Sequence, residues 1–251
     1  MASFLQRSAD ELTALVQDRI RVQDLLFPDG DVRTAADAYT ENVTSRYLNL
    51  AAREVVSGIA ARIRQDRAPV RILELGAGFG GTTTEVIAGL PGSPVDYHFT
   101  DLSPYLLSEA AERYAEHPWM RYGIVDINED FAPDQRYDVV IGGNVLHIAQ
   151  DIGTLLRAVH DMLDPGGAVV FIEACRANYS VLTSMKFLSS AAPGQPHPGL
   201  NDVRAGARIL LTEDEWQSQL VEAGFAPMLV LPTVDHPLYP LDQRIFAAVR
   251  E

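Results

Sequence analysis

From Val70 onward the chain alternates short apolar runs with stretches of helical periodicity, and this alternation constrains its fold more than any other feature. The runs that predict strands are Val70–Leu75, Val95–Thr100, Met120–Val125, Val139–Gly142, Ala168–Glu173, Met228–Leu231 and Arg244–Val249. The stretches that predict helices are Thr82–Leu90, Pro104–His117 and Asp151–Leu163. Near-continuous apolar strands separated by helices are typical of a parallel sheet covered on both faces. We therefore predict a doubly wound α/β fold whose seven-stranded sheet is mostly parallel, with the last strand as a hairpin partner.

The residues before this pattern predict a helical extension that serves as a lid. Ser8 and Glu11 have the spacing of a capping box, and apolar residues follow at helical spacing up to a turn signal at Phe27–Gly30. A second helix is expected from about Thr44 to Arg64. The predicted parts of the chain are the extension at 1–68, the core at 69–251 and a lid-like insertion at about 176–210.

The charge balance argues against nucleic acid and anionic membranes as partners. The chain has 251 residues, with 20 Lys and Arg against 34 Asp and Glu, and its formal net charge is −14 at pH 7. Such a chain is repelled by phosphate-rich surfaces. Its one cysteine, Cys175, suits a reducing compartment, and no apolar run reaches the roughly 18 residues of a membrane helix. We expect a cytoplasmic protein, and the composition leaves its oligomeric state open.

A glycine-rich loop, ELGAGFGG at residues 74–81, follows the first predicted strand. Glycines let the backbone turn tightly and approach a ligand at the N-terminus of the next helix. Gly76, Gly78 and Gly81 also satisfy the dinucleotide fingerprint, so a nicotinamide-dependent oxidoreductase stays open. Glu74 favours a different ligand, because a carboxylate repels a pyrophosphate and attracts a cation. S-adenosylmethionine carries an ammonium group and a sulfonium, and we predict it as the cofactor.

Acidic residues at the ends of the next two strands fit the rest of this cofactor. In a doubly wound fold, ligands bind outside the carboxyl ends of the strands. Asp101 ends the second strand, where it can accept hydrogen bonds from ribose hydroxyls; Asp126 follows the third, where it can bond adenine beside Ile127. Acidic residues at strand ends are also common helix caps. The predicted cofactor-binding residues are Glu74, Gly76, Ala77, Gly78, Asp101, Leu102, Asp126, Ile127 and Asn144.

A histidine and a glutamate stand at the ends of two further strands. His147 follows the fourth predicted strand and Glu173 closes the fifth, and the ends of neighbouring strands converge. A carboxylate bonded to an imidazole fixes its tautomer and stabilises the imidazolium that forms on proton abstraction. Structural roles are also possible, since His147 can pack on the next helix and Glu173 can cap the next segment. Spacing alone does not decide between these interpretations.

The core resembles the class I, S-adenosylmethionine-dependent methyltransferases and, more narrowly, the C-methyltransferase domains of polyketide synthases. The stretches that carry the resemblance are ILELGAGFGGTTTEV, YHFTDLSPYLLSEAAERY, YDVVIGGNVLHIAQDI and LLRAVHDMLDPGGAVVFIEA. GNVLHIA and FIEA are the narrower signals, because the glycine stretch is common to the whole superfamily. The resemblance implies a Rossmann-like fold, S-adenosyl-L-methionine as cofactor, S-adenosyl-L-homocysteine as product, and His147 with Glu173 as a catalytic dyad.

The acceptor is less well defined by the sequence. The residues predicted to line its pocket are Tyr39, Tyr47, Tyr179 and His197. Aromatic residues at helical spacing are also typical of a core, and the loop around His197 is equally compatible with a lid or a solvent loop. No metal is predicted, because the His, Asp and Cys residues lack the spacing of metal ligands.

The leading hypothesis is a stand-alone C-methyltransferase that acts on an activated carbon next to a carbonyl in natural-product biosynthesis. O-methylation of a small carboxylate, phenol or enol is the first alternative, because a histidine base also serves a hydroxyl. A cofactor-binding protein repurposed as a cyclase or partner protein is the alternative from another class. The expected substrate is a small molecule or a carrier-tethered acyl group, and a chain that stands alone favours the free small molecule.

Overall fold

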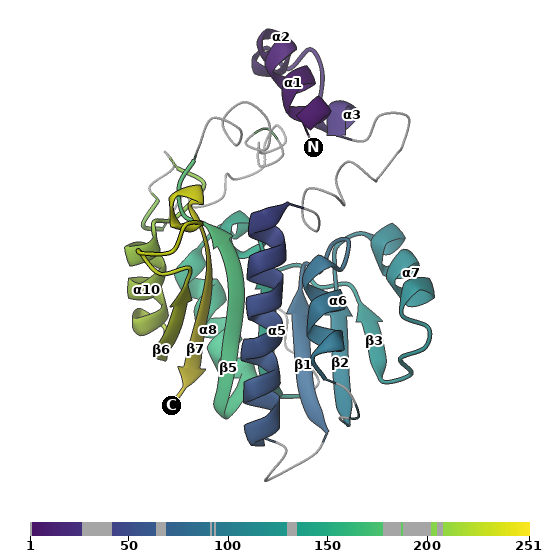
Figure 1. Cartoon of the computed structure of the whole chain (residues 1–251), viewed down its shortest axis with the longest axis vertical. Helices are drawn as coiled ribbons and strands as arrows, with labels where there is room; N and C mark the ends of the chain where they lie inside the picture. The colour runs from purple at the N-terminus through teal and green to yellow at the C-terminus, as the bar shows by residue number, and fades with distance from the viewer. Residues whose placement is uncertain are drawn as a thin grey trace.

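A seven-stranded sheet organises the chain, shown in Figure 1 as a computed structural model. The structure describes residues 2–26, 42–63, 69–90, 92, 94–129, 135–177, 187, 202–204 and 208–251. The strands are β1 Val70–Leu75, β2 Val95–Thr100, β3 Met120–Gly123, β4 Tyr137–Gly143, β5 Leu163–Ala174, β6 Phe225–Leu231 and β7 Gln243–Arg250. Their order is β3-β2-β1-β4-β5-β7-β6, and β7 runs antiparallel to both of its neighbours. The predicted α/β class with a mostly parallel sheet is confirmed.

Strands β1 and β2 have their predicted bounds, and the other five differ from the prediction at one or both ends. The larger differences, in β5 and β6, lie at irregular pairings. β5 begins at Leu163 instead of Ala168, because Leu163 already pairs with Tyr137 before a register shift, after which Ala168 pairs with Val139. β6 begins ahead of the predicted segment, and its pairing with β7 also shifts register, between Pro227 and Leu229. Periodicity alone does not locate such bulges, because they depend on the partner strand.

Helices cover both faces of the sheet (Figure 1). On one face, α5 (Val43–Ile63), α6 (Gly81–Ala88) and α7 (Pro104–Arg113) contribute buried side chains to the core. On the other face, α8 (Ile152–Met162) and α10 (Glu213–Glu222) do so. This two-sided cover explains why the central strands are apolar on both faces.

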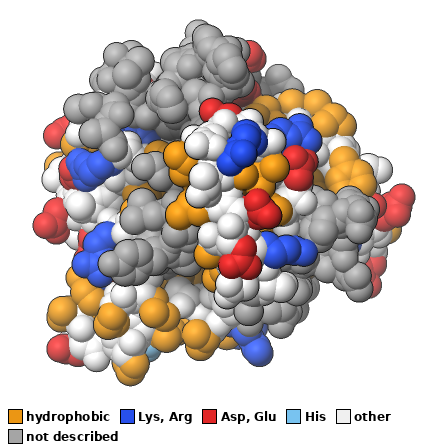
Figure 2. Space-filling model, turned by 90° about the horizontal axis from the view of Figure 1, so that it is seen from above, with side chains coloured by type: hydrophobic (Ala, Val, Ile, Leu, Met, Phe, Trp, Pro, Cys, Tyr) orange, Lys and Arg blue, Asp and Glu red, His pale blue; other side chains and the backbone are white. Residues whose placement is uncertain are grey.

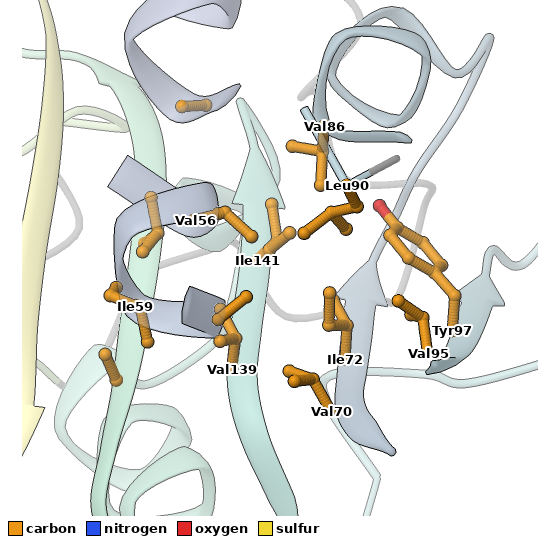
Figure 3. Packing of buried hydrophobic residues seen from close by; sticks show 14 of the residues in the cluster. Val56, Ile59, Val70, Ile72, Val86, Leu90, Val95, Tyr97, Val139 and Ile141 are labelled. Atoms are coloured by element: carbon orange, nitrogen blue, oxygen red, sulfur yellow. The ribbon is translucent and has the colours of Figure 1, made fainter. Parts of the chain in front are cut away.

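The side chains of β4 illustrate the two cores. Val139 and Ile141 point to the face of α5, and Val140 points to the face of α8. Figure 3 shows Val56 and Ile59 of α5 packed over the strands on the first face. All five side chains are at most 4% exposed. Complete burial of each contributes about 1.5–3 kcal/mol, so this packing fixes the strand ends that carry the site.

The helix caps follow local sequence. Ser103 caps α7, because its hydroxyl accepts a hydrogen bond from the Leu106 N–H and Pro104 occupies the first turn. Asp151 caps α8 in the same way, with the Thr154 N–H as donor at 2.6 Å. Between β4 and α8 lies a short 3₁₀ turn, η2 (Leu146–Ile148).

The N-terminal helices differ from the prediction. They are α1 Ala2–Asp10, α2 Leu12–Val16 and α3 Val22–Leu26. Ser8 lies inside α1, and its buried hydroxyl has no hydrogen-bond partner in the described part of the chain, so the predicted capping box is wrong. The physical reason is tertiary: the first turns bury Phe4 against Leu15, Val22 and Leu26, which places the helix start before Ser8. The predicted turn at 27–30 lies outside the described residues, and the extension over 1–68 stays a prediction.

Two broader features concern partners. In the described segments, no helix is long and apolar enough to cross a membrane, and no three His, Cys, Asp or Glu side chains group as metal ligands. The face seen from above in Figure 2 carries acidic and basic side chains interspersed with hydrophobic ones.

Candidate active site

A cavity of about 250 Å³ lies at the carboxyl ends of the parallel strands. This is the edge that a doubly wound sheet is expected to use for ligands. The residues that line it come from α5, the glycine loop, the segments after β2, β3 and β4, and the adjoining ends of β5 and β7: Ser45, Asn49, Glu74, Gly76, Ala77, Gly78, Phe79, Gly81, Thr82, Asp101, Leu102, Val125, Ile127, Gly143, Asn144, Val145, Ile148, Ile172 and Gln243. All but Asp126 of the predicted cofactor residues are among them.

The glycine loop packs closely against the segment that follows β4. Gly76 has a φ of +54°, and a Cβ added to it meets Val145 Cγ2 at 2.4 Å. Gly78 has a φ of +58°, and its N–H donates a hydrogen bond to Asp101 Oδ2 at 2.9 Å. Residues with a side chain rarely adopt this left-handed backbone conformation, so both positions require glycine. At Gly76 a side chain would also clash with Val145.

Asp101 is held in place by backbone donors. Its Oδ2 accepts from Gly78 N–H, and its Oδ1 accepts from Ser103 N–H at 2.8 Å. Each carboxylate oxygen has two lone pairs, so both oxygens keep acceptor capacity toward the cavity. Leu102 follows with an exposed fraction of 53% and forms part of the cavity wall.

Glu74 is a buried carboxylate at the base of the cavity. It is 1% exposed, and its Oε2 accepts hydrogen bonds from Thr83 Oγ1 and Tyr97 OH, both at 2.6 Å. Burial raises the pKa of Glu74 to about 7 against the opposing effect of these two hydrogen bonds, and the nearby Asp101 charge adds to the rise. Both donors are neutral, so a cation beside this carboxylate would restore its charged form.

Asp126 and Asn144 occupy different positions relative to the cavity. Asp126 Oδ1 accepts a hydrogen bond from Asn128 N–H at 2.9 Å, and only the flanking Val125 and Ile127 line the wall. Its predicted contact with adenine stays a prediction. Asn144 lines the cavity with a φ of +54°, and its N–H donates to the Ile172 carbonyl at 2.7 Å. This bond ties the end of β4 to β5.

His147 and Glu173 are brought together as predicted. His147 Nδ1 and Glu173 Oε2 lie 2.7 Å apart, and Glu173 Oε1 accepts from the N–H groups of Leu146 and His147 at 2.7 and 3.2 Å. The Glu173 side chain is fully buried, whereas that of His147 is 15% exposed. The carboxylate therefore binds both the ring and the backbone of η2.

The dyad lies beside the cavity and not in its wall. The lining residues include Val145 and Ile148 on either side of His147, and Ile172 immediately before Glu173. The dyad side chains themselves are not among the described residues that line it. The other ring nitrogen of His147, Nε2, has no hydrogen-bond partner in the described part of the chain. It is therefore the ring atom that remains available to a bound substrate.

The predicted acceptor residues are not assembled in the described cavity. Tyr47 contacts His236 with ring centroids 4.7 Å apart and ring planes tilted by 33°. It packs against the hydrophobic core on the α5 face of the sheet, outside the cavity wall. Tyr39, Tyr179 and His197 lie outside the described residues. The predicted insertion at 176–210 lies mostly outside them as well.

Polar residues missed by the sequence reasoning do line the cavity. Ser45 and Asn49 stand one turn apart on α5, and Asn49 Oδ1 accepts a hydrogen bond from Thr82 Oγ1 at 2.9 Å. Gln243 begins β7, and its buried Oε1 has no partner in the described residues. Ser45 and Asn49 could have been found from the sequence, because they are two polar residues four positions apart on the apolar side of a predicted helix. No local sequence pattern indicates that Gln243 lines a cavity.

Comparisons with known proteins agree with this geometry. Residues 73–169 match the family model described as "Methyltransferase domain". The chain is 37% identical over 185 residues to Polyketide synthase ThaG of Burkholderia thailandensis, and the match covers 70% of this chain and 3% of that synthase. The chain thus spans only a small part of this curated relative.

Two solved structures share the fold over nearly the whole chain. The CurJ carbon methyltransferase superposes with a TM-score of 0.81 at 28% identity, covering 98% of this chain and 65% of that one. The trans-methyltransferase CalH, solved in complex with SAH, has a TM-score of 0.70 at 24% identity, covering 96% of this chain and 65% of that one.

Proposed function

This chain belongs to the class I, S-adenosylmethionine-dependent methyltransferases, and on that premise we propose that it methylates an activated carbon next to a carbonyl in polyketide-type biosynthesis. The observation that carries the proposal is the 2.7 Å contact between His147 Nδ1 and the buried Glu173 carboxylate. A carbon acid needs such a base, because its proton must leave before the methyl group can be accepted. The similarity to the CurJ carbon methyltransferase supports the same class of acceptor.

The chemistry of the cavity wall fits S-adenosylmethionine. The Glu74 carboxylate suits the ammonium group, and the free lone pairs of Asp101 suit the ribose hydroxyls. The apolar side chains of Leu102, Val125 and Ile127 suit the adenine ring. When bound, the cofactor supplies a methyl group on a positively charged sulfur. CalH, solved with SAH, is a relative in fold that binds the corresponding product.

His147 is the base in this proposal. Glu173 holds Nδ1 as the protonated ring nitrogen, which leaves Nε2 to accept the proton of the acceptor carbon. The resulting imidazolium is stabilised by the same carboxylate, whose other oxygen is bound by the backbone of η2. Much of the remaining rate enhancement comes from holding the acceptor carbon in line with the methyl group.

The acceptor belongs to the acyl compounds of polyketide assembly, either free or bound to a carrier. An activated carbon between two carbonyls, as in a β-keto thioester, is acidic enough for an imidazole base. The relative ThaG is a polyketide synthase, which supports this class. Methylation of a hydroxyl by the same base is the competing reaction, and a cofactor-binding protein without transfer is the competing class.

The test uses cofactor labelled with carbon-13 in its methyl group. The protein is incubated with β-keto thioesters, α-keto acids, phenols and small carboxylic acids, and NMR identifies the atom that carries the label. We expect a carbon-bound methyl group on a β-keto thioester. In the H147A variant we expect turnover to fall by about 10²–10⁴-fold, with cofactor affinity unchanged in calorimetry.

The controls separate the alternatives. H117A removes a histidine outside the cavity wall and is expected to keep full turnover. A label on oxygen would replace carbon methylation by O-methylation. Tight cofactor binding without any labelled product would favour the non-transferring class, and full turnover of H147A would contradict the dyad.

A further inference from the structure

A buried arginine outside the cavity is bound to the turn that carries His147. Arg204 is 1% exposed, and its Nη1 donates hydrogen bonds to the carbonyl oxygens of His147 at 2.5 Å and Ile209 at 2.9 Å. Its Nη2 donates to the Ala149 carbonyl at 2.7 Å. The guanidinium thus binds η2 at His147 itself and just beyond its end.

Asp202 completes this contact. Its carboxylate pairs with Arg204 Nη2 at 2.6 Å and also accepts the N–H of Ile152, the first residue of α8, at 3.1 Å. Burial alone would raise the pKa of Asp202, but the hydrogen bonds from Arg204 and from the Ile152 N–H hold it below its ordinary value. The Arg204–Asp202 pair therefore fixes both ends of the connection from η2 to α8.

The turn is thereby held from two directions. Glu173 accepts the N–H groups of Leu146 and His147, and Arg204 donates to the carbonyl of the same His147. Both backbone polar groups of His147 are therefore bound to buried, charged side chains. A fixed backbone restricts the side-chain torsions of His147 and hence the direction of its ring.

We propose that Arg204 is a positioning residue that, with Asp202, orients the His147 ring for proton abstraction. The proposal rests on the proposed function, because it needs His147 to be the base. A buried ion pair is often no more stabilising than apolar residues of similar size, so stability alone does not account for this one. Its specific contribution is geometric, since the planar fork binds the carbonyls at His147, Ala149 and Ile209 together with a carboxylate.

The test replaces Arg204 by lysine, which keeps the charge beside Asp202 but lacks the planar fork. R208A is the matched control, because Arg208 belongs to the same part of the chain but is 45% exposed and pairs with Glu215. Turnover is expressed per cofactor-binding site, as counted by calorimetry with S-adenosylhomocysteine, so that unfolded protein does not lower kcat. NMR of the His147 ring nitrogens reports its tautomer and its bond to Glu173.

We expect R204K to lower kcat by about tenfold or more, with KM and cofactor affinity nearly unchanged and the His147 ring signals shifted. R208A keeps the wild-type kcat and ring signals. In the H147A background, R204K lowers the residual turnover no further, because there is no ring left to orient. Should R204K fold poorly, the R204M/D202N double variant, which removes both charges, is measured in the same way.

Wild-type kcat and ring signals in R204K, with H147A inactive, would overturn the positioning role and leave the proposed function intact. An equal loss from R204K with and without His147 would also overturn it, because a general structural effect acts in both backgrounds. Full turnover of H147A would overturn the proposed base and the positioning role together.

Discussion

Glu74 is a buried carboxylate whose pKa is raised by its surroundings. It lies fully within the protein, where the two bonds to Thr83 and Tyr97 only partly compensate its loss of hydration. With its pKa raised to about 7, the folded protein keeps a proton on Glu74 over a pH range in which the unfolded chain, with a pKa of 4.5, has lost it. Stability without cofactor therefore falls as the pH rises from about 4.5 to 7.

The E74Q variant tests this at the residue scale. Glutamine keeps an acceptor for Thr83 and Tyr97 but has no charge to bury, so it does not titrate. We expect the variant to be more stable than wild type at pH 8, by about 3 kcal/mol, and the difference to vanish below pH 4.5. Urea unfolding without cofactor at pH 4 and pH 8 measures it.

Cofactor binding supplies the complementary readout for Glu74. Because glutamine cannot neutralise an ammonium group, E74Q should bind S-adenosylmethionine more weakly than wild type at pH 8, despite its higher stability. A stability difference independent of pH would contradict the buried charge. Unchanged affinity would contradict the ammonium contact.

Single residues also mark how far the sequence defines the site. Glu74 and Asp101 were predictable, because strand ends in this fold face the ligand whatever the details of packing. Asp126 directly follows its predicted strand, but β3 ends at Gly123, and the Asp126 carboxylate accepts a hydrogen bond from Asn128 N–H in a local turn. Spacing does not reveal this competing local bond. Gln243 enters the cavity only because β7 pairs with β5, a contact between segments far apart in sequence.

At the scale of elements, β1, the glycine loop and α6 form one unit whose shape depends on Gly76. G76A adds a Cβ at 2.4 Å from Val145 Cγ2 and imposes a φ of +54° on alanine. We expect the loop to shift and cofactor affinity to fall at least about tenfold, because backbone strain of 1–3 kcal/mol adds to the clash. Calorimetry with S-adenosylhomocysteine measures the loss.

Two further variants separate the causes. V145A in the G76A background removes the clash but not the positive φ, so affinity should recover only in part. G58A is the control, since Gly58 is exposed in α5 with no atom within 4 Å of an added Cβ, and helix propensity predicts a gain of about 0.5–1 kcal/mol. Full affinity in G76A would show that the loop does not contact the ligand.

The elements differ in how well local sequence defines them. Strands β1 and β2 match their predicted bounds, because a short apolar run between two polar loops determines where each strand begins and ends. The helix α10 was not predicted, although Thr212 and Glu215 form a capping box before it, a local signal that was available. The start of α1 was mispredicted, because the packing of Phe4 decides it and a plausible cap at Ser8 does not.

For the whole molecule, the organisation of the hydrophobic cores suggests two coupled parts. Phe4, Leu15, Val22 and Leu26 form a cluster that shares no buried residue with the two sheet cores. The helices α1–α3 lie beyond the carboxyl ends of the parallel strands (Figure 1). Phe79 of the glycine loop packs against this cluster and also lines the cavity, so it connects the two parts.

F4A tests this coupling. A buried Phe→Ala change costs about 3–5 kcal/mol, which a four-residue cluster cannot absorb, so α1–α3 should open while the sheet cores persist. We expect faster hydrogen exchange confined to residues 2–26, an unchanged melting temperature of the core, and cofactor affinity lowered a few-fold through Phe79.

F246A is the matched control for F4A. Phe246 is equally buried but stacks on Phe171 within the sheet core, so its replacement should lower the melting temperature of the core. Unchanged affinity in F4A with exchange clearly raised would mean that the N-terminal helices are not part of the cofactor site, and a lowered core melting temperature would mean that the two parts unfold as one.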